Sequence, residues 1–289
     1  MKVSGFTFIR NAEKYDYPIV EAISSILPLC DEVVVAVGNS EDATRSLVEA
    51  LGPKIRIIDT VWDDELREGG RVLAIETDKA LAAIAPDADW AIYIQGDECF
   101  HENDHLAIRA GMEKWKNHPE VEGLLFNYLH FYGSFDYVGA SSRWYQREIR
   151  IVRPQSGVFS YKDAQGFRKF PNEKLKVKKI DATVHHYGWV KPPDAMQRKQ
   201  QAFHRLWHDD AWLAENVGNR EEFDYSGIDW LQKFEGTHPK VMIPRIEMQN
   251  WKFDHDLSVD RRSFKEKAKQ TIKRLLGWEI GYKNYRILR

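Results

Sequence analysis

The sequence predicts an α/β fold in which helices cover both faces of a mainly parallel β-sheet. Up to about residue 130, apolar runs typical of buried strands alternate with helical segments of ten or more residues. Such alternation is typical of parallel sheets. Beyond that point the segments become short and mixed, which predicts a smaller antiparallel or mixed sheet.

The expected elements follow in a regular order. A helix that opens at Tyr17-Pro18 has its apolar side chains at helical spacing, namely Ile19, Ile23, Ile26 and Leu27. Another carries Leu47, Val48 and Leu51, and further helices are expected over 72–85 and 106–115. Strands are predicted at residues 3–9, 32–37, 55–58, 90–94 and 123–129.

The sequence after about residue 130 predicts shorter secondary-structure elements than the first part. Short strands are expected at 148–153, 158–161 and 175–180, and Pro192-Pro193 then interrupts the chain. A helix is expected over 195–213, followed by irregular structure over 214–260. We therefore divide the chain into a core domain, 1–190, and a helical or irregular C-terminal extension, 191–289, packed on that core.

Composition narrows the class of protein. Hydrophobic residues make up 43% and charged residues 30% of the chain, which is typical of a globular protein. The net charge of −2 argues against a nucleic-acid partner. Cys30 and Cys99 form neither a disulfide framework nor a metal-type spacing, so a cytoplasmic setting is expected. The abundant aromatic residues suit sugar binding, although many could simply fill the core.

The most informative stretch is residues 90–98, where an apolar run ends abruptly at Asp97 and Glu98. The run is typical of a strand buried on both faces. Ligands of open α/β sheets bind beyond the carboxyl ends of the strands. Carboxylates delivered there could hold a divalent metal against phosphate oxygens, or could form a solvated acidic turn.

Three segments together resemble the family 2-type glycosyltransferases, which belong to the nucleotide-diphospho-sugar transferases of the GT-A fold. They are residues 8–11 (Phe-Ile-Arg-Asn), residues 33–44, and residues 89–98. The resemblance covers roughly residues 3–190 and concerns the order and separation of the motifs. It implies a GT-A, Rossmann-like catalytic domain that binds a nucleotide-sugar, with the smaller sheet and the C-terminal extension appended.

The resemblance implies a nucleotide pocket after the first two strands. Val37 or Gly38 stands where the family usually has an acidic residue that meets the base. Asp42 could instead cap the helix that follows it. The residues predicted to bind the nucleotide are Arg10, Asn11, Ser40, Asp42 and Gln95.

The resemblance also implies a Mn²⁺ or Mg²⁺ site at Asp97 and His186. Gln95 replaces the first carboxylate of the usual Asp-x-Asp pattern, and an amide can still bond to a sugar hydroxyl. His186 matches a late histidine that reaches the metal in this family. Neighbouring residues of an extended segment point oppositely, so only one of His185 and His186 is expected at the site.

A carboxylate in the middle of the chain is expected to act as general base. Asp163 is the first choice and Glu148 the second, although an ion pair with Arg150 or Arg168 would account for either. The residues predicted to bind the acceptor or the diphosphate are His130, Tyr132, Arg150, Arg168 and Lys191.

These predictions converge on sugar transfer from a nucleoside diphosphate sugar to a hydroxyl of a glycan or lipid-linked acceptor. The resemblance implies inversion at the anomeric carbon. The first alternative is a non-catalytic nucleotide- or glycan-binding module, which the replacements at Gln95 and at Val37-Gly38 would favour. A sugar nucleotidyltransferase is disfavoured, because residues 8–13 lack the glycine-rich loop of those enzymes.

The C-terminal segment is strongly basic, with ten Lys or Arg against two acidic residues over 261–289. Its apolar residues share one helical stripe, namely Phe264, Ala268, Ile272, Leu275 and Leu276. Such a stripe could rest on the inner, anionic face of a membrane through residues 261–276, or could dock on the body of the protein.

Overall fold

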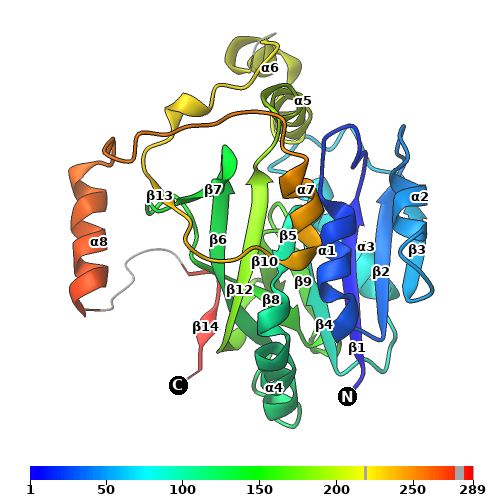
Figure 1. The fold of residues 1–289 in the computed structure, drawn as a ribbon. Helices are drawn as coiled ribbons and strands as arrows, with labels where there is room; N and C mark the ends of the chain where they lie inside the picture. The colour runs from blue at the N-terminus through cyan, green and yellow to red at the C-terminus, as the bar shows by residue number, and fades with distance from the viewer. Residues whose placement is uncertain (218–219, 277–282, 289) are drawn as a thin grey trace.

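The computed structural model describes residues 1–217, 220–276 and 283–288. Within these ranges, eleven strands join one large curled sheet and three strands form a separate small sheet. Helices flank the large sheet (Figure 1). This architecture confirms the predicted α/β class and is consistent with the GT-A arrangement that the sequence resemblance implies.

Four neighbouring strands of the large sheet, which we call its parallel half, run parallel as predicted. Its strands are β1 (Val3–Ile9), β2 (Glu32–Gly38), β3 (Ile55–Thr60) and β4 (Trp90–Tyr93), in the spatial order β3-β2-β1-β4. All three pairings are parallel, so the carboxyl ends of the four strands meet at one edge.

Both faces of this half are buried, which explains why its central strands carry so few charges. Alternate residues of β2 point to opposite faces. Val33 and Val35 belong to the core beneath α1 (Ile19–Ile26), α2 (Thr44–Glu49) and α4 (His105–Trp115), whereas Val34 and Ala36 pack with α3 (Arg71–Ala83).

The predicted smaller sheet is present, but two of the segments assigned to it belong to the main sheet. β8 (Arg147–Val152) lies between β4 and β6 (Gly123–Tyr132) and runs antiparallel to both. β12 (Lys176–Trp189) pairs in parallel with β6. The segments predicted at 148–153 and 175–180 therefore extend the main sheet. The small sheet holds only β9 (Val158–Tyr161), β10 (Gly166–Lys169) and β11 (Glu173–Lys174).

Shorter strands complete the main sheet. β5 (Glu98–Phe100) pairs with β12, and β7 (Ser134–Gly139) pairs with β6. Two strands from beyond residue 190 also join it: β13 (Leu231–Lys233) pairs with β7, and β14 (Arg286–Ile287) pairs with β12.

The prediction of a single helix over 195–213 is wrong, because the chain forms two helices in this region. α5 (Pro193–His204) ends before a turn, and α6 (Asp210–Asn216) begins where the Asp209 carboxylate accepts a hydrogen bond from the backbone N–H of Trp212 at 2.9 Å. Later come α7 (Ile243–Glu247) and α8 (Phe264–Leu276).

Residues 218–219, 277–282 and 289 of the predicted extension, and the Leu276 side chain of the apolar stripe, lie outside what the structure describes. In the described part of the chain, no helix combines the length and the apolar character needed to cross a membrane.

Candidate active site

A large cleft of about 1630 Å³ opens where the parallel strands end. One side is lined by residues that follow β1, β2, β3 and β4, including Arg10, Glu41, Trp62 and Asp97. The rest of the lining comes from the segment before β8 and from residues of α5, α8 and the 283–285 segment. The cleft therefore lies in the position where open α/β sheets bind their ligands.

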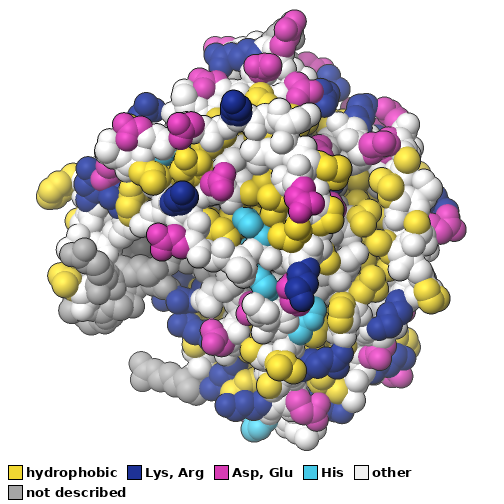
Figure 2. Space-filling view, in the orientation of Figure 1, with side chains coloured by type: hydrophobic (Ala, Val, Ile, Leu, Met, Phe, Trp, Pro, Cys, Tyr) yellow, Lys and Arg dark blue, Asp and Glu magenta, His cyan; other side chains and the backbone are white. Residues whose placement is uncertain are grey.

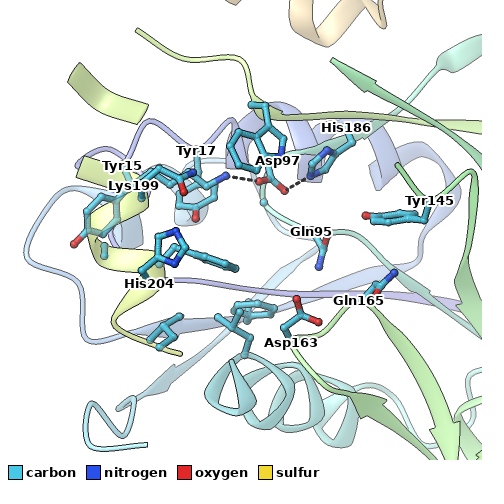
Figure 3. A pocket seen from close by; sticks show the side chains of 18 of the residues that line it. Tyr15, Tyr17, Gln95, Asp97, Tyr145, Asp163, Gln165, His186, Lys199 and His204 are labelled. Atoms are coloured by element: carbon cyan, nitrogen blue, oxygen red, sulfur yellow. Dashed lines mark hydrogen bonds and ion pairs between the residues drawn. The ribbon is translucent and has the colours of Figure 1, made fainter. Parts of the chain in front are cut away.

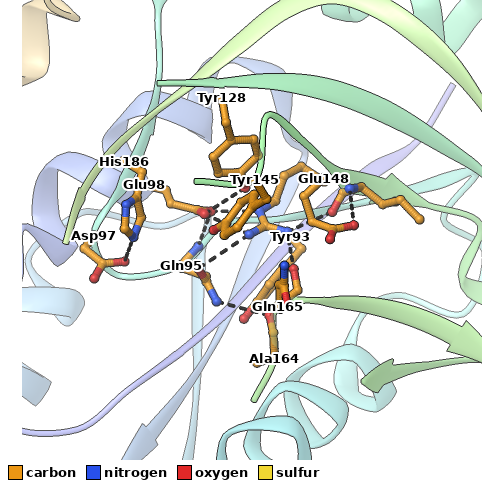
Figure 4. A network of polar contacts seen from close by, with 12 residues as sticks. Tyr93, Gln95, Asp97, Glu98, Tyr128, Tyr145, Glu148, Ala164, Gln165 and His186 are labelled. Carbon is orange, nitrogen blue, oxygen red and sulfur yellow. Dashed lines mark hydrogen bonds and ion pairs between the residues drawn. The ribbon is translucent and has the colours of Figure 1, made fainter. Parts of the chain in front are cut away.

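The two carboxylates after β4 take different roles. Asp97 lines the cleft, whereas Glu98 is fully buried. Glu98 receives two hydrogen bonds from the Arg150 guanidinium, both of 2.8 Å, and one from the Tyr128 hydroxyl, also of 2.8 Å (Figure 4). Only Asp97 is thus available to a ligand.

Asp97 faces His186, with 3.7 Å between Asp97 Oδ1 and His186 Nε2 (Figure 3). This distance is too long for a hydrogen bond. A Cβ at position 188 would come within 2.7 Å of His186 Nε2 and 2.8 Å of Asp97 Oδ2, so only glycine lets the chain pass this close to both side chains. Both side chains line the cleft.

A chain of hydrogen bonds sets the tautomer of His186. His130 Nε2 lies 2.8 Å from the backbone carbonyl oxygen of Tyr145, which can only accept, so this nitrogen carries the hydrogen. His130 Nδ1 then accepts from His186 Nδ1–H at 3.1 Å. Burial lowers the pKa of both imidazoles. Neutral His186 therefore presents an Nε2 lone pair to Asp97, as metal-binding histidines do.

Two lysines complete the surroundings of Asp97, of which Lys191 is buried and Lys199 is partly exposed to the cleft. Lys199 Nζ donates to Asp97 Oδ2 at 3.0 Å and to the Gly188 carbonyl at 2.8 Å. Lys191 and Lys199 both lie 4.8 Å from the ring centre of Tyr17. Burial alone would raise the pKa of Asp97, but the ammonium groups of Lys199 and Lys191 outweigh burial and hold the pKa below its ordinary value. Asp97 is therefore an anion at neutral pH.

The donor set fits a divalent cation only in part. Asp97 supplies a carboxylate oxygen and His186 a nitrogen, whereas no group of three His, Cys, Asp or Glu side chains that could hold a metal occurs among the described residues. His185 points the other way, stacking on Phe131 at 5.8 Å between ring centres. A cation here would need further ligands from a substrate or from water.

Gln95 links the cleft floor to the buried ion pair (Figure 4). Its Nε2 donates to the Ala164 carbonyl at 3.1 Å, and its Oε1 lies 3.5 Å from Arg150 Nη2. Gln95 thereby fixes the turn between β9 and β10, which carries Asp163. Both Lys162 and Ala164, beside Asp163, have positive φ angles, of 57° and 63°.

Both candidates for the general base line the cleft. Asp163 is half-buried, and burial raises its pKa. Glu148 is 1% exposed, and burial raises its pKa to about 7. Asn284 Nδ2 lies 3.5 Å from Glu148 Oε2. Asp163 is the more accessible carboxylate, and neither forms the ion pair with Arg150 or Arg168 that the sequence left open.

The predicted nucleotide residues have separate tasks. Arg10 and Asn11 line the cleft beside Trp62, and both Arg10 and Trp62 keep a buried nitrogen without a partner among the described residues. Ser40 and Asp42 instead join loops, accepting hydrogen bonds from the backbone N–H groups of Asn11 (3.0 Å) and Lys14 (2.8 Å). They shape this end of the cleft without lining it.

The residues predicted to bind the acceptor or diphosphate lie in the packing behind the cleft wall. They are His130, Tyr132, Arg150, Arg168 and Lys191, all buried. Tyr132 donates to the Tyr225 carbonyl at 3.2 Å, Arg168 to the Asn284 carbonyl at 3.2 Å, and Lys191 to the Asp16 carbonyl.

Aromatic side chains on the wall itself were missed by sequence reasoning. They are Trp144, Tyr145 and Trp189. Lys199 was missed as well, because nothing in the sequence near α5 relates it to Asp97. The motif Arg143-Trp144-Tyr145 was the nearest available pointer.

No family model matches the chain, and no curated protein matches it. Solved structures do. Glucosyl-3-phosphoglycerate synthase from Mycobacterium tuberculosis, in complex with Mn²⁺, UDP and phosphoglyceric acid, is 22% identical over 45% of this chain and 43% of that one, with a TM-score of 0.31. S. aureus TarS 1–349 is 14% identical over 76% of this chain and 67% of that one, with a TM-score of 0.39. The chain spans less than half the length of the synthase.

Proposed function

We propose that the protein is a glycosyltransferase that moves a sugar from a nucleoside diphosphate sugar to a hydroxyl acceptor. The observation that carries the proposal is the Asp97–His186 pair on the cleft wall, in which Asp97 is an anion and neutral His186 presents a lone pair. A volume of about 1630 Å³ is ample for a donor and an acceptor together. The sequence motifs at residues 8–11, 33–44 and 89–98 agree with this function.

Asp97 Oδ1 and His186 Nε2 would hold Mn²⁺ or Mg²⁺, and a mixed oxygen and imidazole set suits Mn²⁺ better. When bound, the cation offsets the negative charge that develops on the leaving diphosphate. Lys199 already neutralises part of the Asp97 charge from the other side. It therefore competes with the cation for Asp97 and adds positive charge where the diphosphate would lie.

Asp163 is proposed as the general base, with Glu148 as the second candidate. The base takes the proton of the acceptor hydroxyl while that oxygen bonds to the anomeric carbon, and the bond from this carbon to the diphosphate oxygen breaks. The diphosphate leaves with the electron pair. Attack from the opposite side would invert the anomeric configuration, as the sequence resemblance implies.

Arg10, Asn11 and Gln95 are proposed to bind the nucleotide at the end of the cleft near β1, with Ser40 and Asp42 holding their loops. Trp144, Tyr145 and Trp189 would contact the acceptor. His130 would act through His186, by fixing its tautomer.

Peripheral membrane contact through α8 is a further part of the proposal. Phe264 is 88% exposed and Leu275 is 70% exposed, with Lys265 and Lys267 also exposed on the same helix. In Figure 2 hydrophobic and basic side chains stand out over this helix, at the left. A lipid-linked acceptor would be consistent with such contact.

The alternative, a binding module without catalysis, is favoured by one feature. Gln95 replaces a carboxylate, and its amide is already bonded within the protein. Such a module would bind the donor tightly and leave it intact.

A thermal-shift screen of nucleoside diphosphates with and without Mn²⁺ tests the proposal. We expect one nucleotide to stabilise the protein more with Mn²⁺ than without, and Asp97→Ala to abolish the difference. The matched control is Asp181→Ala, because Asp181 is exposed and lies outside the cleft. Turnover of the matching nucleotide-sugar then separates enzyme from binding module. The absence of any Mn²⁺-dependent shift in the wild-type protein would sink the proposal.

A further inference from the structure

Two C-terminal segments, helix α8 and residues 283–285, lie beside the mid-chain stretch 140–147 and line the cleft with it. We call the part of the cleft formed by these three segments the C-terminal wall. Gln270 Nε2 on α8 donates to the Ala140 carbonyl at 3.2 Å, and the Ser142 hydroxyl donates to Glu266 at 3.3 Å. Asn284 contacts Glu148 at the start of β8. These contacts fix α8 and the 283–285 segment beside the stretch that enters β8, and Figure 1 shows α8 on the side of the molecule away from α2 and β3.

Three of the basic side chains on this wall have no ion-pair partner in the part of the chain that the structure describes. Arg143, Lys269 and Lys283 line the cleft, and within the described ranges no carboxylate lies at ion-pair distance from any of them. Glu266, the nearest acid on α8, receives hydrogen bonds from Ser142 and Ser263 and does not line the cleft. Glu148 is the carboxylate that this wall presents, and burial raises its pKa to about 7.

At the opposite end of the cleft, near β1 and β4, most of the cations that line the cleft do have a carboxylate partner. Four of its cations are paired with carboxylates, in the pairs Arg10–Asp64, Lys14–Glu41, Arg67–Asp210 and Lys199–Asp97. Arg205, beside Arg67, is a cleft-lining cation of this end for which no ion pair occurs among the described residues. Cations that lack a partner inside a concave wall attract an anion from solution. Their concentration on one wall therefore indicates a ligand with negative charge at that position.

Neutral groups on the same wall suit a polyhydroxylated molecule. Asn284 is 7% exposed, and its Oδ1 is buried without a hydrogen-bond donor among the described residues. This oxygen lies next to Glu148 and can accept a hydrogen bond from a hydroxyl. The rings of Trp144 and Tyr145 line the cleft beside it and offer flat faces for a sugar.

We propose that the C-terminal wall binds an acceptor that bears an anionic group, a phosphate ester or a carboxylate, on its sugar or polyol. Lys269, Lys283 and Arg143 hold the anion, and Asn284 accepts from a hydroxyl. The inference rests on the proposed function, because it names the acceptor class of the same cleft. Lysine and arginine both bind phosphate and carboxylate oxygens by charge-assisted hydrogen bonds.

The test is a set of calorimetric titrations with the full chain, in the presence of Mn²⁺ and the nucleoside diphosphate that stabilises it best. The probes are glucose 6-phosphate, glucuronate, inorganic phosphate and neutral glucose. We expect at least one anionic probe to bind about tenfold more tightly than glucose. This preference should shrink as salt rises, because exposed charges are screened. The phosphate and carboxylate probes distinguish the two sources of the anion.

The double variant K269Q/K283Q should bind the anionic probe about tenfold more weakly than the wild-type protein. The variant K269R/K283R, which keeps both positive charges, should retain the wild-type affinity. Lys265→Gln is the matched control, since Lys265 is exposed on α8 and does not line the cleft. Equal binding of charged and neutral probes, or unchanged affinity in K269Q/K283Q, would overturn the inference.

The two proposals fail in different ways. Mn²⁺-dependent nucleotide binding without any anion preference contradicts only the acceptor class. If the wild-type chain binds no nucleotide, the proposed function fails, and the same titrations without nucleotide still decide whether the wall binds anions.

Discussion

The two ends of the cleft use positive charge differently. Near β1 and β4, cations that line the cleft form ion pairs with carboxylates of the protein itself, as in Lys199–Asp97 and Arg10–Asp64. On the C-terminal wall, Lys269 and Lys283 have no such partner among the described residues. We therefore expect the loss of a paired cation to lower the free energy of unfolding, and the loss of an unpaired cation to weaken ligand binding.

The largest effect is expected at the buried ion pair beneath the cleft. Arg150→Met leaves Glu98 without its bidentate partner, and both side chains are 0% exposed. Breaking such a pair costs about 3–5 kcal/mol in free energy of unfolding, which urea denaturation would measure. Lys269→Met is the comparison, with an expected change within about 0.5 kcal/mol. Equal decreases in the free energy of unfolding for the two variants would contradict the expected difference between paired and unpaired cations.

Glu148, the carboxylate between the two ends, predicts a pH dependence. Its pKa in the folded protein is about 7, against an ordinary value of 4.5. The folded protein thus retains this proton longer than the unfolded chain, so the stability that it confers is full below pH 4.5 and is lost as pH rises to 7. Glu148→Gln should remove this loss, a gain of about 3 kcal/mol at pH 8 relative to wild type.

Urea denaturation of wild type and Glu148→Gln between pH 4 and pH 8 would measure this difference, with Glu247→Gln, an exposed glutamate, as control. Parallel pH profiles for wild type and Glu148→Gln would contradict a raised pKa.

Lys199 provides a smaller and more specific test. Lys199→Met removes the ammonium that competes for Asp97, so Mn²⁺ affinity should rise about tenfold, or about 1.4 kcal/mol, while thermal stability without Mn²⁺ falls. Titration followed by Mn²⁺ electron paramagnetic resonance measures the affinity. Arg198→Met is the control, because Arg198 also lines the cleft but pairs with the exposed Asp194. Unchanged Mn²⁺ affinity in Lys199→Met would show that Lys199 does not share Asp97 with a cation.

The smallest effect is expected on the outer face of α8. Phe264→Ser should reduce co-sedimentation with phosphatidylglycerol vesicles a few-fold, because it removes an 88% exposed apolar side chain from a basic helix. Vesicles of phosphatidylcholine serve as control. Equal sedimentation with both lipids would argue that α8 has no membrane role.

The sequence predicted the parallel half of the sheet because strands buried on both faces are apolar throughout, as in residues 33–37 and 90–94. It predicted β12 poorly. Lys179 and Asp181 lie on exposed positions of that strand while Ile180 and Ala182 are buried, so charge interrupts the apolar run without ending the strand. The strand therefore continues to Trp189.

The candidate site was predictable only where a local motif existed. Asp97 and His186 were found from their neighbours in the sequence, and the structure brings them together. Lys199 is separated from Asp97 by 102 positions, and only the packing of α5 makes them partners. Arg150 was predicted to bind the acceptor or the diphosphate, but it forms a buried ion pair with Glu98. The residue type alone does not distinguish these two roles of an arginine.

The most direct test of the central claim is pulsed electron paramagnetic resonance of the protein with Mn²⁺ and its nucleoside diphosphate. We predict a ¹⁴N coupling from one imidazole that disappears in His186→Gln and persists in His185→Gln. A manganese signal without nitrogen coupling, or one lost only in His185→Gln, would contradict the proposed role of the Asp97–His186 pair.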